Sequence, residues 1–168
     1  MPDFLPEKIA EVLTRHGVAC VYIGGFGAFL YGSPLPTSDV DIVPARDHEN
    51  YARLSAALKE LDAKVRAAEL DEPLPFSHDA DSLAAVRVWN LTTKYGDLDI
   101  TVEPSGTAGY DDLRRDARPA SLDGVSIQLA SLADIIRSKE AAGRDKDRRA
   151  LPVLRELLAR QLRERNNQ

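Results

Sequence analysis

Apolar and polar residues follow one another along the chain in patterns that predict several helices and short strands. Apolar residues three or four positions apart predict main helices over residues 6–16, 47–61 and 131–142. Runs rich in β-branched residues, or alternating strictly, predict strands over residues 18–23, 40–43, 86–92, 97–102 and 125–129. A short strand is expected at 63–67 and a helix at 110–116. A last helical region follows Gly143, interrupted or restarted at Pro152, since proline suits a first helical turn.

This order of elements indicates an α/β (α+β) fold, in which a mixed β-sheet is flanked by helices. Residues 1–130 are expected to form the core that contains the sheet, and residues 131–168 a C-terminal helical part packed on it. The length of 168 residues suits one domain with such an appendage. A hydrophobic content of 43% is enough to build a buried core.

The composition favours a cytoplasmic protein with no membrane partner. No run approaches 18 apolar residues, and the N-terminus lacks a basic segment followed by an apolar one. The single cysteine, Cys20, cannot form an internal disulfide and is expected to be a small buried hydrophobe. The net charge of −5 is divided unevenly: residues 1–136 hold 12 basic and 22 acidic residues, whereas residues 137–168 hold 10 basic and 5 acidic ones. The basic C-terminal part could therefore bind a phosphate backbone or a triphosphate.

Two aspartates, Asp39 and Asp41, carry the strongest chemical signal. They alternate with Val40 and Ile42 in a predicted strand, so both carboxylates should project from one face. Like charges this close repel, and a divalent cation would relieve the repulsion. Hard oxygen ligands suit Mg²⁺, so the pair predicts a magnesium site.

A glycine pair, Gly24-Gly25, lies upstream between a predicted buried strand and one or two helical turns at 26–31. Glycines at such a turn let backbone N–H groups approach a ligand closely, and a helix N-terminus favours an anion. Thr37 and Ser38, just before the aspartates, could add hydroxyl bonds to a phosphate. Together these residues predict a phosphate cradle that faces a metal site.

These motifs resemble the polymerase-beta-like nucleotidyltransferase superfamily in its minimal form. The resemblance rests on the segment 23–25, a gap of thirteen residues, and Asp-x-Asp at 39–41. Within the superfamily, segment 36–42 is similar to the Thr-x-Asp-x-Asp of the AbiEii and MenT-type toxin nucleotidyltransferases. Segment 138–147 resembles the helical pattern of that subgroup, in which Lys and small residues precede Arg and Lys-Asp.

The resemblance implies further site residues. A third metal-side carboxylate is expected from the later strand, and the family pattern favours Asp99, whereas Asp97 is expected in the turn after Gly96. Lys139 would be a cationic clamp on the triphosphate, and Arg144 and Asp147 would help to bind the nucleotide. For Asp147, an ion pair with a neighbouring arginine on the helix is the alternative reading.

The implied activity is Mg²⁺-dependent transfer of a nucleoside monophosphate from an NTP to a hydroxyl, with release of pyrophosphate. Asp39, Asp41 and Asp99 would hold one or two ions and, with Lys139, form the catalytic set. The subgroup points to the 3′ end of tRNA as acceptor, and to a toxin with a cognate antitoxin protein. The alternatives are a protein or aminoglycoside hydroxyl as acceptor, or an inactive nucleotidyltransferase-like binding module or antitoxin.

Overall fold

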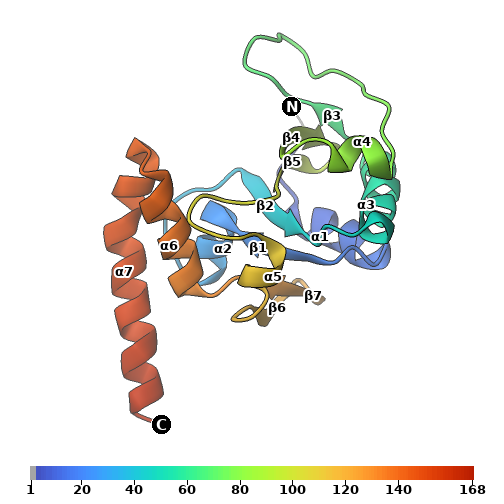
Figure 1. Ribbon diagram of the computed structural model, residues 1–168. Helices are drawn as coiled ribbons and strands as arrows, with labels where there is room; N and C mark the ends of the chain where they lie inside the picture. Colours follow the sequence, from blue (N-terminus) through green and yellow to red (C-terminus); the bar gives the residue numbers. More distant parts are fainter. Residues whose placement is uncertain (1–2) are drawn as a thin grey trace.

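The structure, a computed structural model that describes residues 3–168, is built on one seven-stranded mixed sheet with helices packed around it (Figure 1). The strands are β1 (Cys20–Ile23), β2 (Asp39–Pro44), β3 (Lys64–Val65), β4 (Val88–Thr93), β5 (Gly96–Thr101), β6 (Arg118–Leu122) and β7 (Val125–Leu129). The helices are α1 (Pro6–Arg15), α2 (Gly24–Leu30), α3 (His48–Glu60), α4 (Ala80–Ala84), α5 (Tyr110–Leu113), α6 (Leu132–Ala142) and α7 (Asp145–Asn166). The predicted mixed sheet, flanking helices and C-terminal helices are confirmed. In the described range, no helix is both long and apolar enough to cross a membrane.

The strands lie in the order β3-β4-β5-β2-β1-β7-β6. Two pairs of neighbouring strands are parallel, β2 with β5 and β1 with β7, and both join segments that are distant in the sequence. The other pairs are antiparallel. As a result β2 has β5 as its neighbour, although more than fifty residues separate the two strands in the sequence. This adjacency brings the predicted third carboxylate next to the Asp-x-Asp pair.

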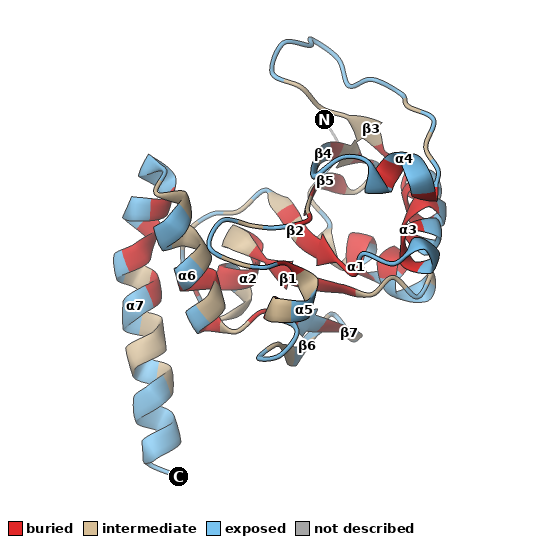
Figure 2. Cartoon of the chain, viewed as in Figure 1, coloured by how far each residue is buried: buried red, intermediate tan, exposed pale blue. Residues whose placement is uncertain are grey.

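Helices cover the two faces of the sheet unequally. On one face, α1 and α3 pack against alternate strand residues, such as Val40 and Ile42, in a large buried cluster. On the other face, a second cluster joins Val21 and Ile23 of β1 to residues of α2, α5, α6 and the first half of α7, and α7 packs on α6. The second half of α7 extends beyond the body of the molecule and is largely exposed (Figure 2). The second face is therefore open over β2, β5 and β4, beside α6 and α7.

Three segments differ from the sequence-based predictions. The strand β6 was not predicted; it contains Pro119, which is tolerated because β6 is the edge strand of the sheet. The short helix α4 was also missed. The predicted break at Pro152 is wrong, because α7 runs through it from Asp145 to Asn166. Pro152 is exposed, while Leu151 and Leu154 beside it are buried, so packing holds the helix together although the proline removes one backbone hydrogen bond.

Candidate active site

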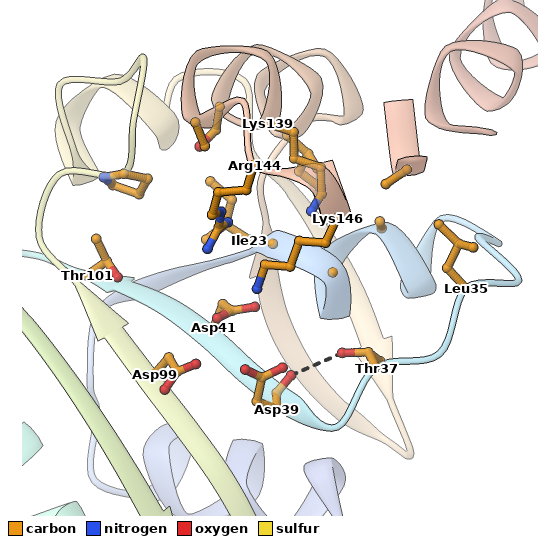
Figure 3. A pocket seen from close by; sticks show the side chains of 18 of the residues that line it. Ile23, Leu35, Thr37, Asp39, Asp41, Asp99, Thr101, Lys139, Arg144 and Lys146 are labelled. Atoms are coloured by element: carbon orange, nitrogen blue, oxygen red, sulfur yellow. Dashed lines mark hydrogen bonds between the residues drawn. The ribbon is translucent and has the colours of Figure 1, made fainter. Parts of the chain in front are cut away.

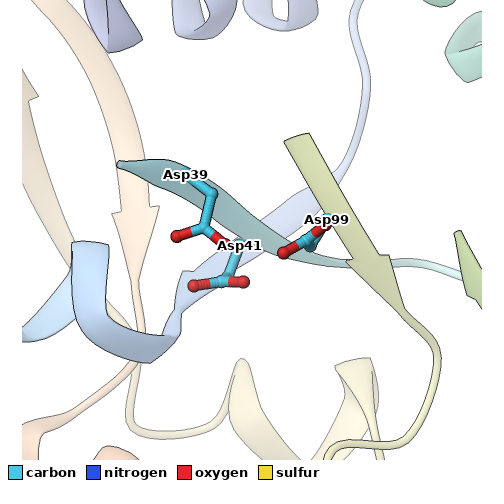
Figure 4. Close-up of side chains that lie close together, drawn as sticks. All are labelled: Asp39, Asp41 and Asp99. Carbon is cyan, nitrogen blue, oxygen red and sulfur yellow. The ribbon is translucent and has the colours of Figure 1, made fainter. Parts of the chain in front are cut away.

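Three carboxylates converge on the open face of the sheet (Figure 4). In the parallel register of β2 and β5, Asp41 is the partner of Asp99, and Asp39 the partner of Asp97. One carboxylate oxygen each from Asp39, Asp41 and Asp99 lies within 4.8 Å of the other two. Alternation in both strands causes this: Val40 and Leu98 point into the core, so the aspartates point away from it. The structure thus brings together the three residues predicted to bind metal.

Asp97 does not lie in a turn, as the sequence suggested, but inside β5 on the same face. Its carboxylate pairs with the guanidinium of Arg66. The turn ends one residue earlier because Gly96, with a φ of +116°, already belongs to the strand ladder opposite Thr93. Sequence proximity to a glycine was therefore a poor guide to the start of this strand.

The carboxylates are crowded, which makes their ionisation costly. Burial, reinforced by the charges of Asp39 and Asp99, raises the pKa of Asp41 to about 8. Burial and the hydrogen bond with Asp39 raise the pKa of Asp99 to about 7, while Arg66 lowers it. A bound cation would remove this cost. Three carboxylate oxygens at one point form a hard donor set, so Asp39, Asp41 and Asp99 fit Mg²⁺ and would be its ligands.

Gly24 sits against this cluster and could not be replaced without a change in it. Its φ of +74° belongs to the left-handed region that favours glycine. A Cβ atom built on Gly24 would lie 2.8 Å from Cγ of Asp41, which is closer than real contacts allow. Gly25 follows it, and a Cβ there would lie 3.7 Å from Oγ1 of Thr37. The glycine pair therefore lets the backbone at the start of α2 come directly beside the acidic cluster.

A single cavity of about 970 Å³ contains these groups (Figure 3). Its walls include the glycine pair, Thr37 and Ser38 on one side, and cationic residues of α6, α7 and their connection on another. The hydroxyl of Thr37 donates to the backbone carbonyl of Asp39 at 3.3 Å, which fixes the loop that enters β2. The volume is within the range of small-molecule binding sites.

Two of the cations at the cavity, Lys139 and Arg144, are held by a fully buried acid, Asp147. Arg144 donates to it through Nε at 2.7 Å, and Nζ of Lys139 lies 3.5 Å from its other oxygen. Lys139, Arg144 and Lys146 all line the cavity, whereas Asp147 does not. The ion pair of Asp147 is made with Arg144, the residue just before α7, and a role of Asp147 in nucleotide binding stays a prediction. The acid organises the cationic wall from behind.

Sequence reasoning missed several residues of the site. Asn90 lines the cavity from β4 and is the register partner of Asp99. Alternation in the predicted strand over 86–92 puts Asn90 on the face opposite Trp89 and Leu91, and this signal could have drawn attention to it. Arg149 also lines the cavity, and its place in the basic C-terminal segment was a weaker signal. Nothing in the local sequence indicated that Arg66 reaches Asp99.

Comparison with known proteins gives matches in structure but none in sequence. No protein-family model and no curated protein sequence matches the chain. Among solved structures, a candidate nucleotidyltransferase from Thermotoga maritima matches with a TM-score of 0.52 and 20% identity over 99% of this chain and 96% of its own. The lincosamide antibiotic adenylyltransferase LnuA, bound to lincomycin, matches with a TM-score of 0.60 and 13% identity over 92% of this chain and 99% of its own. The solution structure of the antibiotic-resistance factor ANT(2'')-Ia matches with a TM-score of 0.50 and 13% identity over 97% of this chain and 96% of its own.

These similarities show that the chain has the fold of the matched structures over nearly its whole length. At 13–20% identity they establish the fold alone. The chemistry must therefore be argued from the residues of the cavity.

Proposed function

We propose that the protein transfers a nucleoside monophosphate from an NTP to a hydroxyl group and releases pyrophosphate. The observation that carries the proposal is the meeting of three carboxylates from β2 and β5 with a cationic wall from α6 and α7 in one cavity. A triphosphate bound to a divalent cation needs both kinds of group at once. The similarity in fold to a structure described as a lincosamide adenylyltransferase supports the same reading.

In the proposed reaction, an acceptor oxygen bonds to the α-phosphorus as the bond between that phosphorus and the bridging oxygen to the β-phosphate breaks. Asp39, Asp41 and Asp99 would hold one or two Mg²⁺ ions. Magnesium, when bound, supplies Lewis-acid stabilisation of the phosphoryl oxygens and of the acceptor oxygen. Asp99 lies level with Asn90 of the neighbouring strand β4 and lines the same cavity, and we assign it the role of accepting the proton of the acceptor hydroxyl.

The other side of the cavity would bind the triphosphate. Gly24 and Gly25 leave room for a phosphate against the backbone, and the hydroxyls of Thr37 and Ser38 can donate to its oxygens. Lys139 would compensate the negative charge that grows on the leaving pyrophosphate. Arg144, held by Asp147, would act in the same way at the rim of the cavity.

For the acceptor, we propose an RNA 3′ end, with tRNA as the first candidate. The support is the charge on α7: Lys146, Arg149 and Arg160 make no ion pair with any residue in the range 3–168. Two of them line the cavity, and Arg160 lies about 16 Å further along the helix, so a phosphate backbone could follow α7 into the site. A toxin role, an antitoxin protein partner and a cytoplasmic location extend this proposal.

A small antibiotic hydroxyl is the second candidate, and a different observation favours it. The loop between β3 and α4 carries Glu69, Asp71 and Glu72, all exposed, and begins at Arg66 beside Asp99. An acidic loop that starts beside Asp99 would attract a cationic molecule to this edge of the sheet. Two of the matched structures are described as a lincosamide adenylyltransferase and an antibiotic-resistance factor.

The test is incubation of the protein with each labelled NTP and Mg²⁺, in separate reactions with total tRNA, an aminoglycoside, a lincosamide and a protein mixture. We expect label to enter one acceptor class, and Asp41→Ala to abolish the transfer while the variant keeps its fold. Label in tRNA selects the first candidate, and label in an antibiotic selects the second. Transfer that persists in Asp41→Ala would overturn the proposal, and transfer that is absent from all four acceptors would replace it with an inactive binding module.

A further inference from the structure

Arg66 joins the edge of the sheet to the acidic cluster. It follows the edge strand β3, and its backbone N–H donates to the carbonyl of Asn90 at 2.9 Å. Its side chain then crosses β4 and reaches two carboxylates of β5. Nη1 lies 2.5 Å from an oxygen of Asp97, and Nη2 donates to Oδ1 of Asp99 at 2.8 Å. Nη1 also donates to the carbonyl of Leu91 at 3.3 Å, so the guanidinium is anchored on the strand that it crosses.

This geometry restricts the Asp99 carboxylate. A carboxylate on a strand can rotate about its terminal torsion, which is broad and weakly restrained. The planar guanidinium removes that freedom because it is bonded to three acceptors at once. With Oδ1 taken by Arg66, the carboxylate has one oxygen left to present to Asp39 and Asp41, and Figure 4 shows an oxygen of Asp99 directed toward Asp41.

We propose that Arg66 is a positioning residue that holds Asp99 in the orientation needed to bind a divalent cation and to face the acceptor. The inference deepens the proposed function and rests on it for the catalytic role of Asp99. Two effects of Arg66 must be separated. The positive charge of Arg66 weakens the binding of a cation nearby by repulsion. Its fixed geometry strengthens the binding of that cation, because it orients the Asp99 carboxylate.

A double-mutant cycle on metal binding separates these effects. The variants are Arg66→Lys, which keeps the charge but lacks the planar fork, Asp99→Asn, and the two combined. The readout is the Kd for Mn²⁺ alone, titrated by electron paramagnetic resonance without nucleotide. We expect Arg66→Lys to weaken Mn²⁺ binding about 3- to 10-fold in the otherwise wild-type protein. In the Asp99→Asn background the same substitution should weaken it by less than about twofold, because a residue that acts through a partner has no effect once that partner is removed.

Arg87→Lys is the matched control. Arg87 pairs with Glu103 at 3.2 Å outside the acidic cluster and is more exposed than Arg66, so its substitution should not change the Kd for Mn²⁺. If Arg66→Lys does not fold, Arg66→Gln takes its place in the cycle. This variant also removes the positive charge of Arg66, but it does so equally in the presence and in the absence of Asp99. The loss of charge therefore cancels when the two effects on the Kd are compared. In turnover with saturating metal, Arg66→Lys should lower kcat about tenfold or more with little change in KM for the NTP, because the phosphate-binding groups lie on the other side of the cavity.

Unchanged Mn²⁺ affinity in Arg66→Lys, or equal weakening with and without Asp99, would overturn the inference, since Arg66 would then act by charge or by general stability. A wild-type protein that transfers no nucleotide would defeat the proposed function only. The Mn²⁺ cycle would still decide whether Arg66 orients Asp99.

Discussion

Replacement of Asp41 by asparagine should stabilise the metal-free protein while it abolishes the proposed reaction. Asp41 is crowded by Asp39 and Asp99, and burial raises its pKa from 3.8 to about 8. In the unfolded chain the same group ionises near its ordinary value. Between these two pH values the folded protein therefore binds a proton that the unfolded chain has released. The free energy of unfolding then falls as the pH rises from about 4 to about 8.

The size of the effect follows from the shift. One pKa unit corresponds to ~1.36 kcal/mol, so a shift of about four units gives an upper limit of about 5 kcal/mol at pH 8. Local opening of the cavity to water would reduce this value, and we expect Asp41→Asn to be about 2–5 kcal/mol more stable than the wild type at pH 8. Near pH 4 the carboxyl is protonated in the folded wild type, so the difference should nearly vanish.

The measurement is urea unfolding with EDTA at pH 4, 6 and 8, repeated at pH 8 with excess Mg²⁺. Magnesium should stabilise the wild type more than the variant, because the variant has lost one of three carboxylate ligands. Asp71→Asn, on the exposed loop, is the matched control and should show no gain at any pH. A gain in stability that does not depend on pH, or no gain at pH 8, would refute the idea that burial and crowding keep Asp41 protonated in the folded protein.

Three further substitutions test other parts of the structure. Gly24→Ala should lower turnover by about tenfold or more and cost about 1–2 kcal/mol in urea unfolding. The reason is that the new Cβ would meet Asp41 and that the residue has a positive φ. Unimpaired turnover would contradict the placement of Gly24 against Asp41. Lys139→Met should lower kcat/KM for the NTP about tenfold or more, because the leaving pyrophosphate loses a cation, and an unchanged kcat/KM would argue against the clamp. It should also cost about 1–3 kcal/mol in urea unfolding, since buried Asp147 loses one of its two cationic partners. Asn50→Leu should cost about 2–4 kcal/mol with kcat unchanged, because its side chain makes three hydrogen bonds to Ala19 and Ala45, away from the cavity; thermal unfolding and turnover together check this.

The sequence alone was sufficient for features that depend on neighbours along the chain. Alternation put Asp39 and Asp41 on the face opposite Val40, as the structure has it. The glycine stop of α6 was also visible, because Gly143 adopts the left-handed conformation that ends a helix. The main helices and five strands were identified for the same reason, with shifts of one or two residues at their ends.

Only the tertiary structure decided how distant segments combine. Asp99 lies level with Asp41 because of the register between the parallel strands β2 and β5. The packing of both strands on the core sets this register. The ion pair of Arg66 with Asp99 needs that register and the crossing of β4 as well. Local spacing carries no information on such contacts, because their energy arises only when the whole sheet has formed. The sequence thus specified which acidic and cationic groups were available, and the folded sheet determined which of them share one cavity.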